Sequence, residues 1–145
     1  MNHEKFDIVI VEDNENDAGL IIRTLRKNNI TKNFIVLEDG EKALDFFLCR
    51  GPYSKRNITV LPKVIFLDIK LPKVDGLDVL MQLRLNEHTK KIPTVIVSSS
   101  KQDSDIETAY ELGANSYIVK PVDFNQFKSI IDQLGLYWLK TNESL

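Results

Sequence analysis

The sequence has little of several features that define whole classes of protein. It contains a single cysteine, Cys49, which excludes an internal disulfide framework. No apolar run approaches the roughly 20 residues of a membrane-spanning helix, and the first run, Ile8 to Val11, is too short for a signal peptide and is followed by acids. None of the six glycines builds a glycine-rich phosphate loop after a strand, which argues against a nucleotide or flavin binder.

Excess charge of either sign is also lacking. The formal net charge is −2, so no basic excess points to nucleic acid or to an anionic membrane as a partner. The chain has 145 residues, of which 43% are hydrophobic and 28% are charged, as is usual for one soluble globular domain. We therefore expect residues 1–145 to form a single domain without an attached output domain, in a cytoplasmic protein.

What the sequence does have is a regular alternation of short apolar runs and amphipathic segments. The runs predict strands at Phe6 to Val11, Phe34 to Leu37, Val64 to Asp68, Thr94 to Ser98, and Tyr117 to Val119. Helical spacing predicts helices from Glu15 to Asn28, after Asp39-Gly40, from Asp75-Gly76 to Asn86, from Asp103 to Leu112, and from Asp123 to Leu139. The residues between Gly51 and Pro62 are predicted to form a loop. Strands alternating with helices predict an α/β fold with a doubly wound parallel sheet and helices on both faces.

Polar residues stand where these strands end. Glu12 and Asp13 follow the first strand, Asp68 ends the third, Ser98 ends the fourth, and Lys120 follows the fifth. The carboxyl ends of parallel strands lie along one edge of the sheet, where open α/β sheets bind their ligands. Each residue alone has an ordinary explanation, such as a solvated turn, a loop or an exposed charge. Their joint placement predicts one cleft holding three carboxylates, a hydroxyl and an ammonium.

This combination favours a particular chemistry. Three carboxylates repel one another when ionised, and a hard divalent cation relieves the repulsion. Mg²⁺ suits a site with few protein ligands and several waters. A carboxylate can also attack a phosphoryl group to give an aspartyl phosphate. Lys120 and the Ser98 hydroxyl could then stabilise the charge on the phosphoryl oxygens.

Over essentially its full length, the chain resembles the receiver domains of two-component response regulators. The matching motifs are Glu12-Asp13, Asp68 with Leu71-Pro72 and Asp75-Gly76, Ser98, Gly113-Ala114, and Lys120-Pro121. It is most similar to stand-alone, chemotaxis-regulator-like members. The loop from Gly51 to Pro62, Phe46-Phe47-Leu48 and Tyr137-Trp138-Leu139 look like the regulators paired with phytochrome-type sensor kinases.

The resemblance implies a flavodoxin-like sheet with strand order 2-1-3-4-5 and a role for each site residue. Asp68 would accept a phosphoryl group from a sensor histidine kinase. Mg²⁺ would be held by Glu12, Asp13, Asp68 and the backbone carbonyl of Lys70. Ser98 would be the switch hydroxyl and Lys120 the phosphate-binding ammonium, joined to Pro121 by a cis bond. Tyr117 would be the aromatic residue that rotates inward when the switch hydroxyl moves.

Two positions of this family tune the lifetime of the phosphate, and here they hold Lys70 and Ser100. Neither side chain is an acid or an amide that readily orients an attacking water, and Lys70 could lean over the phosphate instead. We therefore expect slower self-dephosphorylation than in regulators with an amide and a carboxylate at these positions.

The output is expected to pass through a protein surface, because the sequence shows no DNA-binding or catalytic output domain. The family mechanism changes the face made by the helix from Asp103, the fifth strand and the last helix. Leu136, Tyr137, Trp138 and Leu139 stand in a row at the end of that helix. One side of this row can fill the core, and the other favours homodimerisation or an unknown downstream protein. The alternative is that the helix end folds back on its own core.

Two other functions compete with a phosphorylated switch. A haloacid-dehalogenase-type phosphatase, the enzyme alternative, also uses an Asp nucleophile, but it needs a second Asp at the position of Lys70 and lacks the Glu12-Asp13 pair. A pseudo-receiver that only binds partners would not need the intact acidic set. We therefore expect no enzyme activity beyond self-catalysed phosphoryl transfer to Asp68 and hydrolysis from it.

Overall fold

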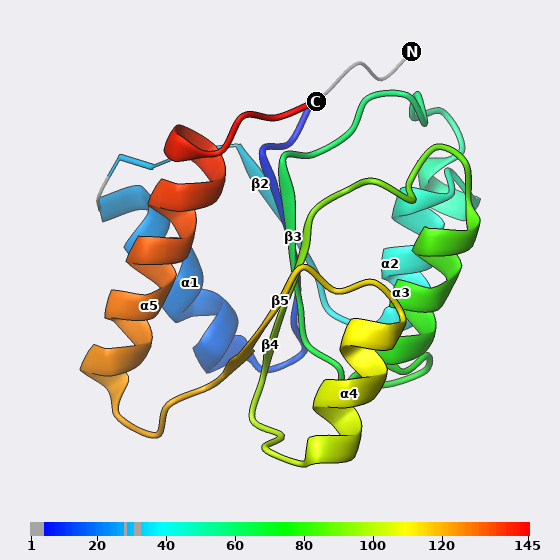
Figure 1. Cartoon of the computed structure of the whole chain (residues 1–145). Helices are drawn as coiled ribbons and strands as arrows, with labels where there is room; N and C mark the ends of the chain where they lie inside the picture. Colours follow the sequence, from blue (N-terminus) through cyan, green and yellow to red (C-terminus); the bar gives the residue numbers. More distant parts are fainter. Residues whose placement is uncertain (1–4, 28, 31–32) are drawn as a thin grey trace.

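The computed structural model describes residues 5–27, 29–30 and 33–145 and consists of one sheet between two layers of helices (Figure 1). The strands are β1 (Ile8–Val11), β2 (Phe34–Leu37), β3 (Val64–Leu67), β4 (Thr94–Ser98) and β5 (Ser116–Val119). They are parallel in the order β2-β1-β3-β4-β5. The predicted α/β class, parallel sheet and strand order are confirmed.

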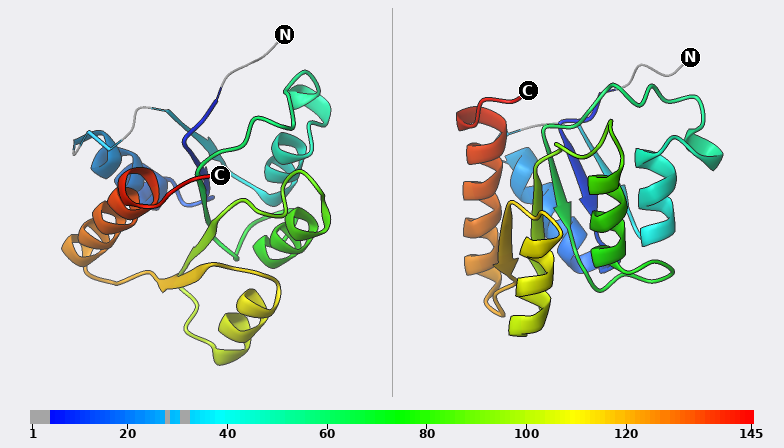
Figure 2. Two further views of the ribbon diagram at one scale, coloured as in Figure 1. Left: turned by 45° about the horizontal axis from the view of Figure 1, so that its top comes forward. Right: turned by 45° about the vertical axis from the view of Figure 1, so that its right-hand side comes forward.

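The helices are α1 (Glu15–Lys27), α2 (Gly40–Phe47), α3 (Gly76–Leu85), α4 (Asp103–Glu111) and α5 (Phe124–Leu136). Helices α1 and α5 cover one face of the sheet, and α2, α3 and α4 cover the other (Figures 1 and 2). Asn28, the predicted last residue of the first helix, lies outside the described residues. Among the described residues, no helix is long and apolar enough to cross a membrane.

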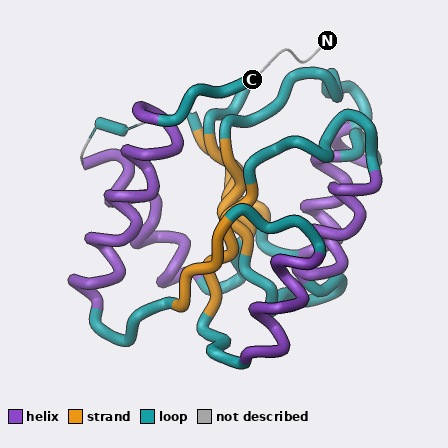
Figure 3. Tube along the Cα trace, viewed as in Figure 1, coloured by secondary structure: helices purple, strands orange, loops and turns teal. Residues whose placement is uncertain are grey.

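The strands form the central layer because they are apolar on both faces (Figure 3). Val9 and Ile65 belong to the core under α2, α3 and α4, and Ile8 and Val64 belong to the core under α1 and α5. Successive residues of a strand point to opposite faces, so each strand contributes to both cores. This double burial fixes the register and thereby aligns the strand ends at one edge.

The end of the last helix and the start of the long loop differ from the sequence predictions. Helix α5 ends at Leu136 and continues as a π-helical turn, Tyr137–Thr141, and a 3₁₀ turn, Gly51–Tyr53, lies in the predicted loop. No proline or glycine stands just after Leu136 to mark the change. Phe124 is apolar, yet it is 57% exposed because it is the first residue of α5, beyond the end of β5.

The peptide bond between Lys120 and Pro121 also differs from what the resemblance implies. The described residues contain no cis peptide bond, so this bond is trans. The trans form is the one that X-Pro bonds prefer, by about 0.5–1 kcal/mol. The Lys120 N–H donates to the Ser98 carbonyl at 2.7 Å and so ties the end of β5 to that of β4.

Gly76 links the fold to the strand edge. It is buried at the start of α3, and its N–H donates to the Ile69 carbonyl at 2.9 Å. A Cβ at this position would lie only 2.1 Å from the Asp68 carbonyl oxygen. Only glycine lets α3 approach the end of β3 this closely.

We expect Gly76→Ala to lower the free energy of unfolding by about 1–3 kcal/mol, because backbone must move to admit the methyl group. Gly19→Ala in α1 is the matched control, since its Cβ would meet only the flexible end of Arg23, at 3.0 Å. Alanine should there be neutral or stabilising by up to about 1 kcal/mol. Urea unfolding of both variants measures the difference, and equal midpoints would contradict the close-packing argument.

Candidate functional site

The sheet brings the predicted carboxylates together. Glu12 and Asp13 follow β1 and Asp68 follows β3, and these two strands are neighbours in register. One carboxylate oxygen from each of the three residues lies within 4.8 Å of the others. Glu12 is 3% exposed and Asp68 is 6% exposed, whereas Asp13 faces solvent. They lie in a polar cleft of about 660 Å³ at the carboxyl edge of the sheet.

Lys120 reaches into this cleft from the end of β5. Its Nζ lies 2.6 Å from Glu12 Oε1 and 2.9 Å from Asp68 Oδ2. A third carboxylate, Asp17 Oδ2, lies 2.9 Å from the same nitrogen. The three N–H donors of one ammonium thus face three carboxylates. Asp17 was not among the predicted site residues, although its place in the first turn of the helix after Glu12-Asp13 is a local signal.

The charges of the cleft alter one another's ionisation. Burial is the main cause that raises the pKa of Glu12, from 4.5 to about 7; the charge of Asp68 adds to it, and Lys120 partly offsets it. For Lys120, burial alone would lower the pKa, but the hydrogen bonds to Asp17, Glu12 and Asp68 more than compensate and raise it. The ammonium is therefore charged, and one carboxyl of the cleft binds a proton readily.

The donor set fits a hard divalent cation. Glu12, Asp13 and Asp68 offer oxygen ligands close together, and the charge of Asp68 disfavours ionisation of Glu12. Mg²⁺ and Mn²⁺ prefer such ligands. The predicted fourth ligand is the backbone carbonyl of Lys70, which lies with Asp68 in the loop after β3. The Lys70 N–H donates to Asp68 Oδ1 at 3.1 Å.

Ser98 lies beside the cleft rather than in its wall. Its side chain is fully buried, and its Oγ accepts a hydrogen bond from the Ser100 N–H at 3.2 Å. The neighbouring Ser99 is the serine that lines the cleft. The Ser98 hydroxyl is thus held by its own loop.

Ser100 contacts Tyr117 and Asp105, and Lys70 joins this group through Asp105. Its carbonyl accepts from the Tyr117 hydroxyl at 3.0 Å, and its own hydroxyl donates to Asp105 Oδ2 of α4 at 2.5 Å. Lys70 Nζ lies 3.7 Å from the same Asp105 oxygen. The two predicted tuning residues, Lys70 and Ser100, therefore share one carboxylate that the sequence analysis did not single out.

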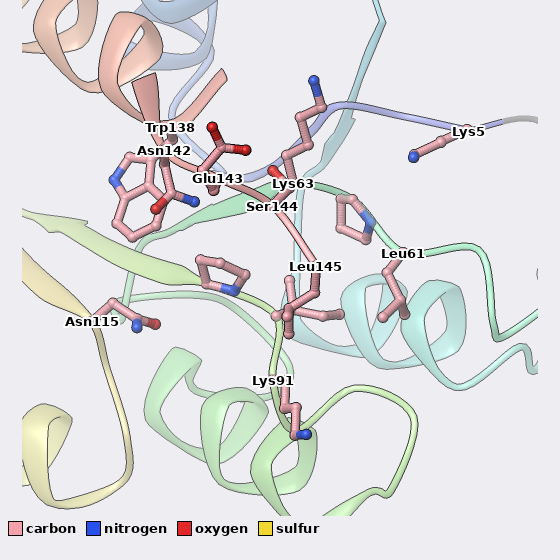
Figure 4. Close-up of a pocket in the computed structure, with 13 residues that line it drawn as sticks. Lys5, Leu61, Lys63, Lys91, Asn115, Trp138, Asn142, Glu143, Ser144 and Leu145 are labelled. Atoms are coloured by element: carbon pink, nitrogen blue, oxygen red, sulfur yellow. The ribbon is translucent and has the colours of Figure 1, made fainter. Parts of the chain in front are cut away.

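Another cavity, of about 320 Å³, lies at the opposite, amino edge of the sheet (Figure 4). Trp138 and the residues after the π-helical turn form part of its wall, together with Lys63 and Lys91. Its wall contains none of the predicted site residues. The predicted site residues lie instead at the carboxyl edge.

A doubly wound sheet with an acidic cleft and a lysine at its carboxyl edge defines the receiver domain of two-component signalling. The chain belongs to this family: residues 8–132 match the family model of the response regulator receiver domain. The predicted family is thereby confirmed, and with it the class of two-component response regulators.

Individual relatives agree with this assignment. The probable methanogenesis regulatory protein FilR2 of Methanothrix harundinacea is 36% identical over 141 residues, which cover 97% of this chain and 88% of FilR2. Response regulator Rcp1 of Synechocystis sp. is 32% identical over 134 residues, 92% of this chain and 89% of Rcp1. Its Mn²⁺-bound structure has a TM-score of 0.88 at 31% identity and covers 95% of this chain and 97% of that one. The phosphorylated cyanobacterial phytochrome response regulator RcpA gives 0.88 at 32% identity over 99% of both chains.

The raised pKa of Glu12 predicts how stability changes with pH in the absence of divalent metal. Between pH 4.5 and about 7 the folded chain keeps a proton on Glu12 that the unfolded chain has released. The unfolded state then binds fewer protons, so the Glu12 contribution to the free energy of unfolding falls as pH rises through this window. Urea unfolding of the wild type and of Glu12→Gln, measured with a chelator present across this pH range, gives this contribution.

The glutamine variant cannot ionise, so its stability should change less with pH in this window. Added Mg²⁺ at about pH 8 should restore stability to the wild type, because binding to the folded state alone stabilises it. A wild type and a Glu12→Gln variant with parallel pH profiles would show that Glu12 titrates normally.

Proposed function

We propose that this receiver domain accepts a phosphoryl group on Asp68 from a histidine of a sensor kinase and thereby switches a protein-binding surface. One observation carries the proposal: Lys120 Nζ lies 2.9 Å from Asp68 Oδ2 in a buried cluster of carboxylates. A fixed positive charge beside the Asp68 carboxylate supports a role for this residue in phosphoryl transfer. The match between the family model and residues 8–132 supports the same function.

In the proposed step, a carboxylate oxygen of Asp68 attacks phosphorus in line with the bond to the donor nitrogen. The O–P bond forms as the P–N bond breaks, and the imidazole leaves with the electron pair and takes up a proton. Phosphoryl transfer depends mainly on positioning and on stabilisation of charge at the equatorial oxygens. Lys120, which the carboxylate contacts hold in the cleft, would bind one of those oxygens, and the Ser98 hydroxyl would donate a hydrogen bond to another.

Glu12, Asp13, Asp68 and the Lys70 carbonyl are the proposed ligands of Mg²⁺. When bound, the ion supplies positive charge beside the phosphoryl oxygens. The oxygen-only donor set supports this assignment, as does the charge of Asp68, which disfavours ionisation of Glu12. The Mn²⁺-bound structure of the relative Rcp1 supports it independently.

The proposed switch runs from the cleft to the face formed by α4, β5 and α5. Movement of the Ser98 hydroxyl towards the phosphoryl group would release Ser100, the residue that holds the Tyr117 hydroxyl. At the end of this face, Leu136 is 45% exposed and Tyr137 is 50% exposed. These apolar side chains support homodimerisation or binding of a downstream protein as the output.

The partners follow from the same argument. The donor is proposed to be a sensor histidine kinase, and the similarity to the phytochrome regulator RcpA supports one of the phytochrome type. We propose that residues 1–145 act as one receiver domain in the cytoplasm, with no enzyme activity towards other substrates. The family match argues against the phosphatase alternative.

Acetyl phosphate and Mg²⁺ should add one phosphoryl group to the wild type and none to Asp68→Asn, because the amide is a far poorer nucleophile. Intact mass detects the adduct. The size in solution, measured for the phosphorylated protein and for the protein with bound beryllofluoride, tests for a dimer. Omission of Mg²⁺ should remove the adduct. A folded wild type that gains no adduct would identify a pseudo-receiver that acts by binding alone.

Lys70 and Ser100 should make the phosphorylated state long-lived, since neither orients water. The double variant Lys70→Asn, Ser100→Glu should lose its phosphate about tenfold faster, as a positioned acid and amide assist the attacking water. Decay is followed by intact mass after removal of the donor. A double variant that decays no faster than the wild type would remove this role from both positions.

A further inference from the structure

Lys120 has more partners than the proposed reaction needs. Glu12 is a proposed metal ligand, and Asp68 is both a ligand and the residue that becomes phosphorylated. Asp17 has neither role, yet its Oδ2 is as close to Lys120 Nζ as Asp68 Oδ2 is, at 2.9 Å. Of the three carboxylates on the ammonium, Asp17 alone is not required elsewhere during the proposed cycle.

We propose that Asp17 is a positioning residue that holds the Lys120 ammonium over Asp68 throughout phosphoryl transfer. The inference rests on the proposed phosphoacceptor function and adds to it a residue outside the expected set. Asp17 does not touch the reacting atoms. It keeps one N–H of Lys120 engaged while the other two turn from Glu12 and Asp68 to the phosphoryl oxygens.

The local structure makes Asp17 a firm anchor. The Asp17 N–H donates to the Asn14 side chain at 3.0 Å, so the first turn of α1 is capped directly at this residue. The Lys120 backbone is fixed in turn by its bond to the Ser98 carbonyl. The lysine side chain therefore spans two rigid elements, α1 and the end of β5.

Burial makes the contact energetically significant. The side chain of Lys120 is 10% exposed and that of Asp17 is 28% exposed. Exposed ion pairs contribute little because water and salt screen them, whereas loss of one partner of a buried pair leaves an uncompensated charge. Without Asp17, the ammonium is free to leave Asp68 whenever Glu12 binds metal.

The first measurement is the rate of phosphorylation by acetyl phosphate with Mg²⁺, followed by intact mass. Asp17→Ala should react about tenfold to 100-fold more slowly than the wild type, since a misplacement of about 1 Å can cost about 100-fold in rate. Asp17→Asn keeps an oxygen acceptor at the same position and should fall between the two.

Glu15→Ala is the matched control. It removes a negative charge from the same turn of α1, and among the described residues no ion pair joins Glu15 to Lys120. Its phosphorylation rate should change by less than about twofold, as for an exposed charge. Equal rates for Asp17→Ala and Glu15→Ala would show that only net charge matters.

The second measurement observes the ammonium directly by ¹⁵N-detected NMR, with Mg²⁺ and beryllofluoride bound. The wild type and Glu15→Ala should show a slowly exchanging Lys120 ammonium signal, and Asp17→Ala should lose it while its amide spectrum remains that of the folded protein. An intact signal in Asp17→Ala would overturn the proposal, whether or not its rate falls.

The two measurements separate the inference from the proposed function. If the wild type gains no phosphoryl group, the proposed function fails, and the Lys120 signal without beryllofluoride still decides whether Asp17 holds the ammonium. If the wild type is phosphorylated and Asp17→Ala reacts equally fast, the positioning role alone is wrong.

Discussion

The site depends on the compensation of buried negative charge by one ammonium. Glu12 and Asp68 are almost fully buried at adjacent strand ends, and the charge of Asp68 raises the electrostatic cost of ionising Glu12. Lys120 contacts both and is itself nearly buried. Removing one member of such a group typically costs about 3–5 kcal/mol, because an uncompensated charge remains in the interior. The cluster therefore acts as one unit, and it lies at the carboxyl edge of the parallel sheet.

The same incomplete compensation of charge makes the cluster sensitive to added cations. The ammonium neutralises only part of the charge of the carboxylates, so the cleft favours any further cation that oxygen ligands can hold. In the proposed cycle, Lys120 then exchanges carboxylate partners for phosphoryl oxygens without leaving the cleft. Ionisation, metal binding and phosphorylation thus act on one set of atoms, and a change in any of them alters the others.

The sequence predicted the fold and the convergent strand ends because both depend on local patterns. Short apolar runs marked the strands, and parallel pairing placed Asp68 beside Glu12. Asp17 was missed because its contact joins residues 103 positions apart and requires the first turn of α1 to lie next to the end of β5. The contact between Asp105 and Lys70 was missed for the same reason, because it joins α4 to the loop after β3. The π-helical turn after Leu136 carries no glycine or proline signal, so the sequence predicted a longer regular helix.

One residue, Ser100, links the cleft to the surface, although the sequence predicted for it only an effect on the lifetime of the phosphate. Ser100 uses its N–H on Ser98, its carbonyl on Tyr117 and its hydroxyl on Asp105. If the Ser98 oxygen turns towards a phosphoryl group, the Ser100 N–H loses its acceptor, and an unpaired N–H is costly away from water. The loop must then rearrange, and its carbonyl and hydroxyl move with it. Because one of these groups holds the aromatic of β5 and the other holds α4, two of the three elements of the proposed output face would respond to the same displacement.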